Sequence, residues 1–363
     1  MGLYWGCFAA YVPVLKAQIG ASDALFGIVL LGSATGLVSS MWLAPRADRA
    51  LGARAMQVGA VLLLVAWMLP GYATLPLMFA VVMSFVGLAS GLLDVVMNAR
   101  VSELEAQHGR SLMNFNHAMF SLAYGVGALA AGAAREADLP VQAVMLMLGV
   151  LTVLAMPFMR QEVRHVAPQE GYSGRYPLMP IVVCGAIVLT AFMSEATVEA
   201  WSALHVERTL GGGAAEGALG PAMLGLTMAL GRLSGQAIAE RLHEIPVIVA
   251  GGVLAAFGAV IAATAPDPGT AYLGFGILGL GVSVVGPMGL AMVGRLVPPH
   301  LRTEAIARAA VISYSGFFLA PSLSGFISQA YGLRTVFWAI ALLLLRAVPL
   351  ALALRRMPAY GAR

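Results

Sequence analysis

Residues 246–265 read PVIVAGGVLAAFGAVIAATA, a run without a charged side chain. A helix needs roughly 20 predominantly apolar residues to cross the hydrocarbon core of a bilayer. Similar runs recur along the chain, and short stretches that hold the charges and turn residues separate them. The runs are continuously apolar, whereas a membrane β-barrel strand alternates with a period of two. They therefore predict transmembrane helices.

The composition agrees with a membrane protein. Of the 363 residues, 60% are apolar and only 10% are charged, and the mean hydropathy is +0.86. A soluble domain usually carries about 25% charged residues. A chain this apolar lacks the polar side chains for a water-facing surface, so we expect lipid to face most of the molecule.

The apolar runs predict an all-α integral membrane protein with twelve transmembrane helices. The spans lie near residues 1–16, 24–44, 54–71, 74–99, 113–134, 140–159, 177–205, 215–239, 246–265, 269–293, 304–330 and 332–354. This many spans leave no room for a large extramembrane domain. The first run, Gly2–Leu15, is short for a crossing, so either its neighbours help it or the natural chain begins before Met1.

The positions of Lys and Arg predict the orientation. Fifteen of the 21 basic residues fall on one side of the predicted membrane. The other side holds four, and two further cations lie inside spans: Lys16, Arg135, Arg208 and Arg334, then Arg232 and Arg346. Because basic residues concentrate in cytoplasmic loops, we expect both termini in the cytoplasm and an even number of spans. The same bias accounts for the net charge of +4 without a nucleic-acid partner.

Short internal matches indicate a duplication. Ala47-Asp48-Arg49 recurs as Ala239-Glu240-Arg241 and Gly87-Leu88-Ala89 as Gly279-Leu280-Gly281, both 192 positions later. These matches fall at equivalent places in two six-helix halves, a layout found in secondary transporters. The sequence therefore predicts an N-terminal six-helix bundle at 1–159, a cytoplasmic linker at 160–176 and a C-terminal six-helix bundle at 177–363.

Residues 44–54, APRADRALGAR, resemble the signature loop between spans two and three of the major facilitator superfamily, with Ala44 in place of the usual Gly. The resemblance implies the twelve-helix fold of that superfamily, with two pseudo-symmetric bundles. In the family this loop closes the cytoplasmic side through charge contacts. The implied gating residues are Asp48, Arg49 and Arg54, with Glu240 and Arg241 in the second copy. An ordinary positive-inside loop is the alternative.

A second resemblance bears on the substrate. Residues 91–98, GLLDVVMN, resemble the Leu-Glu-Thr-x-x-Asn run of fucose-permease-like sugar–proton symporters, and residues 114–118, NFNHA, resemble the run that opens their span five. Within that branch the chain is most similar to the YbjJ/MosC type. Asp94 stands where the symporters have Glu, which keeps a titratable carboxylate and shortens its reach.

Ionisable groups inside spans are functional candidates, because an Asp at a helix centre costs about 2.5–3.5 kcal/mol on insertion scales. Asp94 and Asn98 are four residues apart and share a helix face, as do Glu195 and Glu199. We expect the substrate to bind at Asn98, Asn114, Glu195, Glu199, Trp201 and Tyr314. The alternative is that these groups only bond neighbouring helices. Arg232 is expected to be structural, snorkelling or pairing with a loop acid.

Asp94 and His117 are the predicted proton-coupling pair. Spans four and five are antiparallel neighbours whose connection is centred near Gln107, so residues equidistant from it lie at similar depth. Asp94 and His117 should therefore share a layer. A carboxylate and an imidazole in one layer can exchange a proton near neutral pH. We expect Asp94 to carry the proton and His117 to tune it or bind substrate; a fixed interhelical hydrogen bond is the alternative.

The small-residue spacings predict close helix packing and not chemistry. They are Gly32-x-x-x-Gly36, Gly87-x-x-x-Gly91 and Gly231-x-x-x-Gly235.

An enzyme is not expected, since neither His-Glu-x-x-His nor Gly-x-Ser-x-Gly occurs. Residues 274–279 match the dinucleotide fingerprint, but they lie in an apolar span with no preceding strand, so the match is accidental. We expect no catalytic residue, no metal site and no cofactor.

The function that we expect is secondary active transport of a small polar solute, such as a sugar, a polyol or an amino sugar, by alternating access and proton symport. The partners would be the solute, protons and the lipid bilayer, the location the bacterial inner membrane, and the state a monomer. A proton-coupled exporter of a small metabolite or drug is the alternative, and a non-transporting receptor is a third. The stretch Gly125–Gly132 lacks the Pro of the antiporter motif, which disfavours an exporter.

Overall fold

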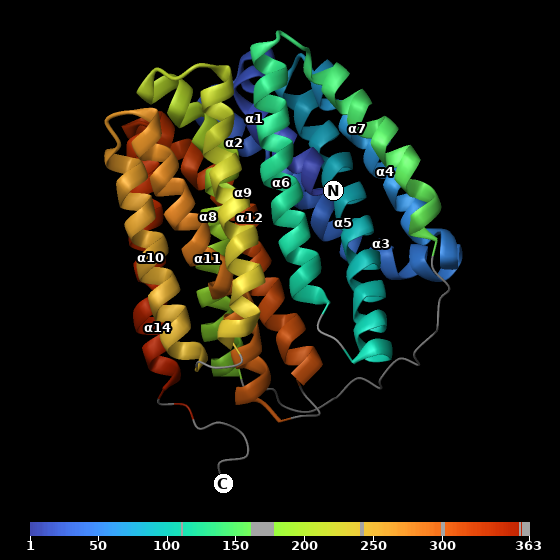
Figure 1. The fold of residues 1–363 in the computed structure, drawn as a ribbon, viewed down its shortest axis with the longest axis vertical. Coiled ribbons are helices and arrows are strands. Elements are labelled where there is room, and N and C mark those ends of the chain that lie inside the picture. The colour runs from blue at the N-terminus through green and yellow to red at the C-terminus, as the bar shows by residue number, and fades with distance from the viewer. Residues whose placement is uncertain (110–111, 161–177, 240–242, 299–301, 356, 358–363) are drawn as a thin grey trace.

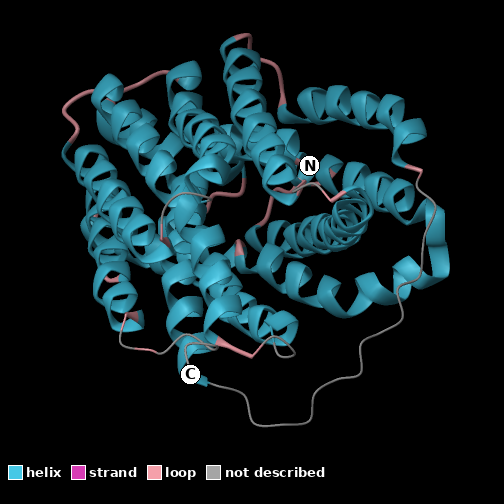
Figure 2. Cartoon of the chain, turned by 60° about the horizontal axis from the view of Figure 1, so that its bottom comes forward, coloured by secondary structure: helices cyan, strands magenta, loops and turns pink. Residues whose placement is uncertain are grey.

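The computed structural model describes residues 1–109, 112–160, 178–239, 243–298, 302–355 and 357. This part of the chain is helical throughout and holds no β-strand. The helices lie side by side and are joined by short loops (Figure 2). The all-α fold predicted from the apolar runs is therefore confirmed for the described residues.

The helices form two groups, which Figure 1 shows next to each other, with blue to green on the right and yellow to red on the left. The N-terminal half is made of α1 (Gly2–Gln18), α2 (Asp23–Val29), α3 (Leu31–Leu51), η1 (Gly52–Arg54), α4 (Ala55–Met68), η2 (Pro70–Tyr72), α5 (Pro76–His108), α6 (Met113–Glu136), α7 (Val141–Ala155) and η3 (Met156–Met159). The C-terminal half is made of α8 (Leu178–Leu204), the π-helical turn η4 (His205–Thr209), α9 (Ala214–Ala239), α10 (Glu244–Thr264), α11 (Pro268–Leu296), α12 (Arg302–Tyr331), α13 (Leu333–Leu345) and α14 (Ala347–Leu354).

Nine segments of the described residues are long and apolar enough to cross a membrane. The first of them, Asp23–Tyr72, covers 50 residues and takes in α2, α3 and α4. Helices α1 and α9 are not among the nine, although α1 packs against α6 and α9 against both α6 and α11. The multi-pass character is confirmed, and a count of twelve crossings stays a prediction.

Two predicted spans are interrupted. The span near 24–44 breaks at Leu30, between α2 and α3, and the span near 332–354 breaks at Arg346, between α13 and α14. Pro349 explains the second break, because it has no N–H to donate to the carbonyl of Leu345 four residues earlier. One further helix is longer than expected, since α5 continues to His108 through the polar stretch that we predicted as a loop.

The predicted small-residue contacts are present between α3 and α5. A Cβ at Gly36 would collide with the carbonyl oxygen of Ser84 on α5, and one at Gly87 would collide with that of Ser33 on α3. Gly91 lies against Ser40 of α3 in the same way. The two glycine pairs thus face each other and let the backbones of α3 and α5 touch.

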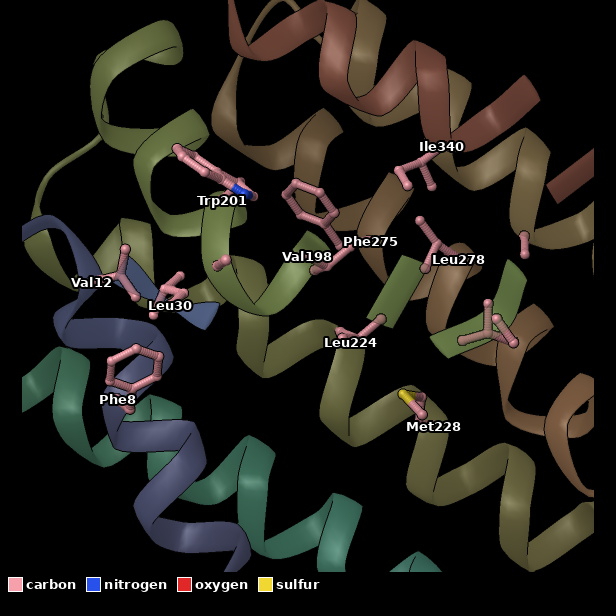
Figure 3. Packing of buried hydrophobic residues seen from close by; sticks show 14 of the residues in the cluster. Phe8, Val12, Leu30, Val198, Trp201, Leu224, Met228, Phe275, Leu278 and Ile340 are labelled. Carbon is pink, nitrogen blue, oxygen red and sulfur yellow. The ribbon is translucent and has the colours of Figure 1, made fainter. Parts of the chain in front are cut away.

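The core of each half is apolar and continuous with the other. Phe8 and Val12 of α1 lie near Leu30 in the N-terminal half (Figure 3). In the C-terminal half Trp201 of α8 lies near Phe275 of α11 (Figure 3). The halves meet where α6 packs against α9 and α2 packs against α12. The space between these two contacts holds the site.

Candidate functional site: a central cavity between the halves

A cavity of about 220 Å³ lies between the two halves. Its wall is made of Met1, Trp5, Phe8, Leu30, Ser33, Ala34, Leu37, Gly87, Ser90, Asp94, His117, Phe120, Phe192, Glu195, Ala196, Glu199, Ala200, Arg232, Tyr314, Phe317 and Pro321. Apart from Met1, which precedes α1, and Leu30, which lies between α2 and α3, these residues come from α1, α3, α5, α6, α8, α9 and α12. Both halves therefore contribute polar and aromatic side chains to one space.

Asp94 lies on the cavity wall contributed by α5. Its carboxylate is hydrogen-bonded by the side chain of Asn98, four residues further along the same helix face. It also interacts electrostatically with Tyr314 of α12 and with the N-terminal amino group. The predicted shared face of Asp94 and Asn98 is thus present, and Asn98 reaches the cavity only through Asp94.

His117 of α6 lines the same cavity as Asp94, as the hairpin geometry predicts. In the described part of the chain no hydrogen bond or salt bridge joins the two side chains. Helices α5 and α6 make few contacts, because α5 packs mainly on α3 and α6 on α9. Asp94 and His117 therefore line one cavity and are not a bonded helix pair.

Glu195 and Glu199 of α8 also line the cavity, one helical turn apart. Arg232 of α9 forms a salt bridge with Glu195, with 3.7 Å between Nη2 and Oε2. Its other nitrogen, Nη1, donates to the hydroxyl of Ser121 and to the backbone carbonyl of His117 on α6. The pairing with a loop acid that we expected for Arg232 is wrong, because its acidic partner lies in the cavity wall.

Aromatic rings line another part of the wall. The rings of Phe192 and Phe317 lie 4.9 Å apart between centroids, and Phe192 and Tyr314 lie 5.4 Å apart. Trp5 of α1 lines the cavity from the opposite half. The predicted site residue Tyr314 is therefore in place beside other rings that offer flat apolar faces.

Besides Asn98, two predicted site residues do not line the cavity. The indole of Trp201 is fully buried and packs edge-on against Phe26, with ring centroids 6.0 Å apart. Asn114, at the start of α6, is not among the lining residues. Arg232 lines the cavity although we did not predict it as a site residue, and its position inside a predicted span was the available signal.

The predicted gating loop makes a charge contact within the N-terminal half. Asp48 of α3 forms a 2.5 Å salt bridge with Arg100 of α5, whose side chain is buried. Arg49 and Arg54 are exposed. Glu240 and Arg241 lie outside the described residues, as does most of the predicted linker. The described charge contact thus joins two helices of one half.

A second charge cluster lies at the opposite ends of the helices. We call this side of the molecule the Asp23 end. The carboxylate of Asp23 on α2 accepts bonds from Lys16 at 3.0 Å, from Arg208 at 2.5 and 2.9 Å, and from the hydroxyl of Ser328 at 2.5 Å. Gln329 of α12 accepts a bond from the backbone N–H of Asp23. One carboxylate therefore ties α1 and α2 to the C-terminal half.

A second salt bridge between the halves lies at the same end. Arg135 of α6 forms a bidentate pair with Glu207 at 2.6 and 3.0 Å and also donates to the carbonyl of Ala10. Glu207 and Arg208 are consecutive residues of η4, and each bonds to a different helix of the N-terminal half. π-Helical turns are frequent at functional sites. Here the turn holds both halves together at the Asp23 end.

Comparisons with known proteins agree with this architecture. The family profile of the Major Facilitator Superfamily matches residues 1–246 and 183–362. An uncharacterized MFS-type transporter of Yersinia pestis is 30% identical over 98% of this chain and 93% of its own length. The membrane protein MosC of Rhizobium meliloti is 26% identical over 94% of this chain and 84% of its own length.

Two solved structures have the same fold. One is a bacterial homologue of the human lysosomal transporter Spinster in an inward-facing and occupied conformation, with a TM-score of 0.75, 15% identity, and coverage of 100% of this chain and 97% of that chain. The other is the human organic anion transporter MFSD10, with a TM-score of 0.65, 15% identity, and coverage of 96% and 97%. With two groups of apolar helices around a polar cavity and a profile match along nearly its full length, the chain belongs to the major facilitator superfamily of membrane transporters.

Proposed function

We propose that this transporter moves a small polar solute through the central cavity by alternating access and couples the movement to protons. The observation that carries the proposal is the cavity itself, which sets three carboxylates, one guanidinium and one imidazole between the two halves. Its volume of about 220 Å³ is below the 300–1,000 Å³ or so of sites for drug-sized ligands. A sugar, a polyol or an amino sugar suits this space.

The chemistry of the wall supports a hydroxylated solute. Glu195 and Glu199 offer carboxylate oxygens that accept hydrogen bonds from hydroxyl or amino groups. Arg232 offers donors, and the rings of Phe192, Tyr314 and Phe317 offer faces for the apolar side of a sugar ring. Asn98 and Asn114 lie further from the solute in this arrangement.

Asp94 is the proposed proton carrier. It has a hydrogen-bonding amide, Asn98, and among the described residues no side chain of Lys or Arg forms a salt bridge with it. A carboxylate inside a membrane without a salt-bridge partner is expensive, so binding of a proton is a natural way to neutralise it. His117, which lines the same cavity, would tune this proton or contact the solute.

Alternating access is supported by the contacts between the halves. The salt bridges Arg208–Asp23 and Arg135–Glu207 lie at the Asp23 end, which the distribution of basic residues assigns to the outside. The salt bridge Asp48–Arg100 at the other end stays within one half. We infer that the structure is closed to the outside, and that opening outward requires the bonds at the Asp23 end to break.

A proton-coupled exporter of a small metabolite or drug is the second candidate. One observation favours it: six aromatic rings line the cavity, those of Trp5, Phe8, Phe120, Phe192, Tyr314 and Phe317. Flat apolar faces suit planar drug-like cations as well as sugar rings.

The test starts from purified protein and a thermal-shift screen against sugars, polyols, amino sugars and drug-like cations. A stabilising solute is then followed as a radiolabelled tracer in proteoliposomes loaded with the unlabelled compound. Alternating access predicts tracer counterflow without an imposed proton gradient. Stabilisation without counterflow would make the protein a receptor, and stabilisation by drug-like cations alone would favour the exporter.

A further inference from the structure

Besides the central cavity the structure holds a small recess between α6, α8 and α9. Its wall is made of Phe120, Ser121, Tyr124, Glu195, Glu199, Leu224, Gly225 and Met228. The volume is about 10 Å³, which is about the space of one water molecule. Because Phe120, Glu195 and Glu199 also line the central cavity, the recess adjoins the proposed solute site.

Tyr124 presents a polar atom to this recess that lacks a partner. The residue is 5% exposed, and its hydroxyl makes no hydrogen bond to any described residue. The ring is held in place by α9, since a Cβ at Gly225 would lie 2.6 Å from Cδ1 of Tyr124. Buried hydroxyls are nearly always hydrogen-bonded to protein or to an ordered water. The rigid position and the unmet hydroxyl indicate a hydrogen-bonding ligand in the recess.

Glu199 is the second group without a partner. Glu195, one turn earlier on the same face of α8, has Arg232, and Asp94 has Asn98. Within the described residues Glu199 forms neither a hydrogen bond nor a salt bridge, while Glu195 and Tyr124 lie close enough to interact with it electrostatically. Two carboxylates one turn apart repel each other, and one guanidinium balances only one of them. A proton on Glu199 removes the excess charge.

We propose that the recess binds one water molecule, and that this water and the hydroxyl of Tyr124 hold the carboxyl of Glu199, which thereby serves as a proton-carrying group separate from Asp94. The step is a simple protonation, in which a carboxylate oxygen of Glu199 takes a proton from a hydronium ion in the central cavity, becomes a carboxylic acid and leaves a neutral water molecule. Release is the reverse. The water would have Ser121, Tyr124 and the two carboxylates as partners, within the usual two to four.

The groups that face Glu199 in the recess come from three helices, and Asp94, His117 and Tyr314 line the central cavity with it. Tyr124 and Ser121 belong to α6, Glu195 to α8 itself, and Arg232 reaches the same wall from α9. Tyr124 is a positioning residue in this arrangement, because it acts through the carboxyl and the water. The inference rests on the proposed proton-coupled transport for its purpose, but the site can be tested without knowing the solute.

The experiment is infrared difference spectroscopy of the purified protein in lipid, comparing acidic with alkaline buffer. The carbonyl stretch of a protonated carboxyl group is followed in the wild type and in Glu199→Gln, Glu195→Gln and Asp94→Asn. Tyr124→Phe keeps the ring and removes the hydroxyl. Tyr4→Phe is the matched control, because Tyr4 is an equally buried tyrosine that bonds to Thr152 at 2.9 Å, outside the recess. Exchange into ¹⁸O-labelled water identifies the O–H stretch of a bound water.

We expect a titrating carbonyl band that disappears in Glu199→Gln and persists in Asp94→Asn. Tyr124→Phe should move this band to higher frequency and abolish an ¹⁸O-sensitive water band, and Tyr4→Phe should change neither. The proposal is overturned if no titrating band belongs to Glu199, or if Tyr124→Phe leaves the Glu199 and water bands as they are. Ser121→Ala, which removes another wall hydroxyl, gives the same test if Tyr124→Phe does not fold. If the infrared result is as expected but counterflow is absent, the proposed transport is wrong and the assignment of Glu199 as a proton-binding group stands.

Discussion

Glu195 and Arg232 form the salt bridge inside the proposed solute site, and their surroundings differ. Arg232 is fixed by Ser121 and His117 on α6, whereas the carboxylate of Glu195 has Arg232 on one side and the cavity on the other. The guanidinium is therefore held as part of the wall. The free edge of Glu195 is left to contact a solute.

Glu195→Gln should weaken binding of the stabilising solute about tenfold, which corresponds to about 1.4 kcal/mol. The amide keeps the size of the side chain but loses the charge that strengthens a hydrogen bond to a hydroxyl or ammonium group. Titration of the thermal shift with solute measures the change. Glu216→Gln is the control, since Glu216 bonds to the backbone of Gly213 outside the cavity. Equal affinities in Glu195→Gln and the wild type would leave Glu195 a helix-packing group.

At this scale the sequence predicted four of the five Asp, Glu, His and Arg side chains in the cavity wall, and Arg232 is the fifth. The four are Asp94, His117, Glu195 and Glu199. An ionisable residue inside a span almost always faces the interior of the helix bundle or a polar cavity, because contact with lipid is costly. Trp201 was predicted from its closeness to Glu195 along the chain. Six residues on an α-helix turn the side chain by about 240°, which points it away from the face of Glu195. No local sequence pattern marks Tyr124 as a residue of the recess, because its environment depends on contacts between helices.

The glycine pairs of α3 and α5 set the distance between two helices of the N-terminal half. Gly87→Ala should lower the midpoint of thermal unfolding in detergent, since the new methyl group meets the carbonyl of Ser33 and the helices must separate. Overpacking of this kind costs about 1–3 kcal/mol. Gly213→Ala is the control, because the nearest atom to its Cβ is 3.8 Å away. A Gly87→Ala midpoint equal to that of the control would contradict the close packing.

The turn η4 is predicted to hold the Asp23 end shut. Removing the charge of Arg135 with Arg135→Gln breaks its bidentate pair with Glu207 and should shift the protein toward a conformation open at that end. Spin labels at Ala137 and Gly213, both exposed and on opposite halves, report the opening as a longer distance. The exchanged pair Arg135→Glu with Glu207→Arg should restore the shorter distance. If Arg135→Gln leaves the distance distribution unchanged, the pair is not part of a gate.

The boundaries of the helices show which features of an element the sequence predicts and which it does not. The apolar runs placed the helices and the glycine spacings placed the α3–α5 contact, because both depend on periodicity along one chain segment. The π-helical geometry of η4 and the break at Leu30 had no such signal. The break at Leu30 lies in the segment between Gly27, which packs on Pro321 of α12, and Gly32, which packs on Ala80 of α5, and such contacts between distant residues are invisible in local sequence.

The orientation that we predict for the whole molecule rests on the distribution of basic residues. Three of the four basic residues on the predicted outside are held in salt bridges, and Arg334 donates to the carbonyl of Ala263. They are thus structural contacts and not free loop charges.

The predicted orientation places Pro266 outside the cell and Gln107 in the cytoplasm. A cysteine at Pro266 should therefore react with an impermeant thiol reagent added to intact cells, and one at Gln107 should not. Cys7 and Cys184 are buried, so the background is low. The reverse labelling pattern would invert the topology.

The most direct test of the account is accumulation of the identified solute by proteoliposomes with and without an imposed proton gradient. The proposed mechanism requires both halves, the cavity between them and a carboxylate that carries the proton. We expect the wild type to accumulate solute only with the gradient. Asp94→Asn should lose this accumulation and keep counterflow, while Asp267→Asn, at a helix cap outside the cavity, should behave as the wild type. Gradient-driven accumulation by Asp94→Asn at the wild-type level would contradict the assignment of Asp94 as the coupling residue.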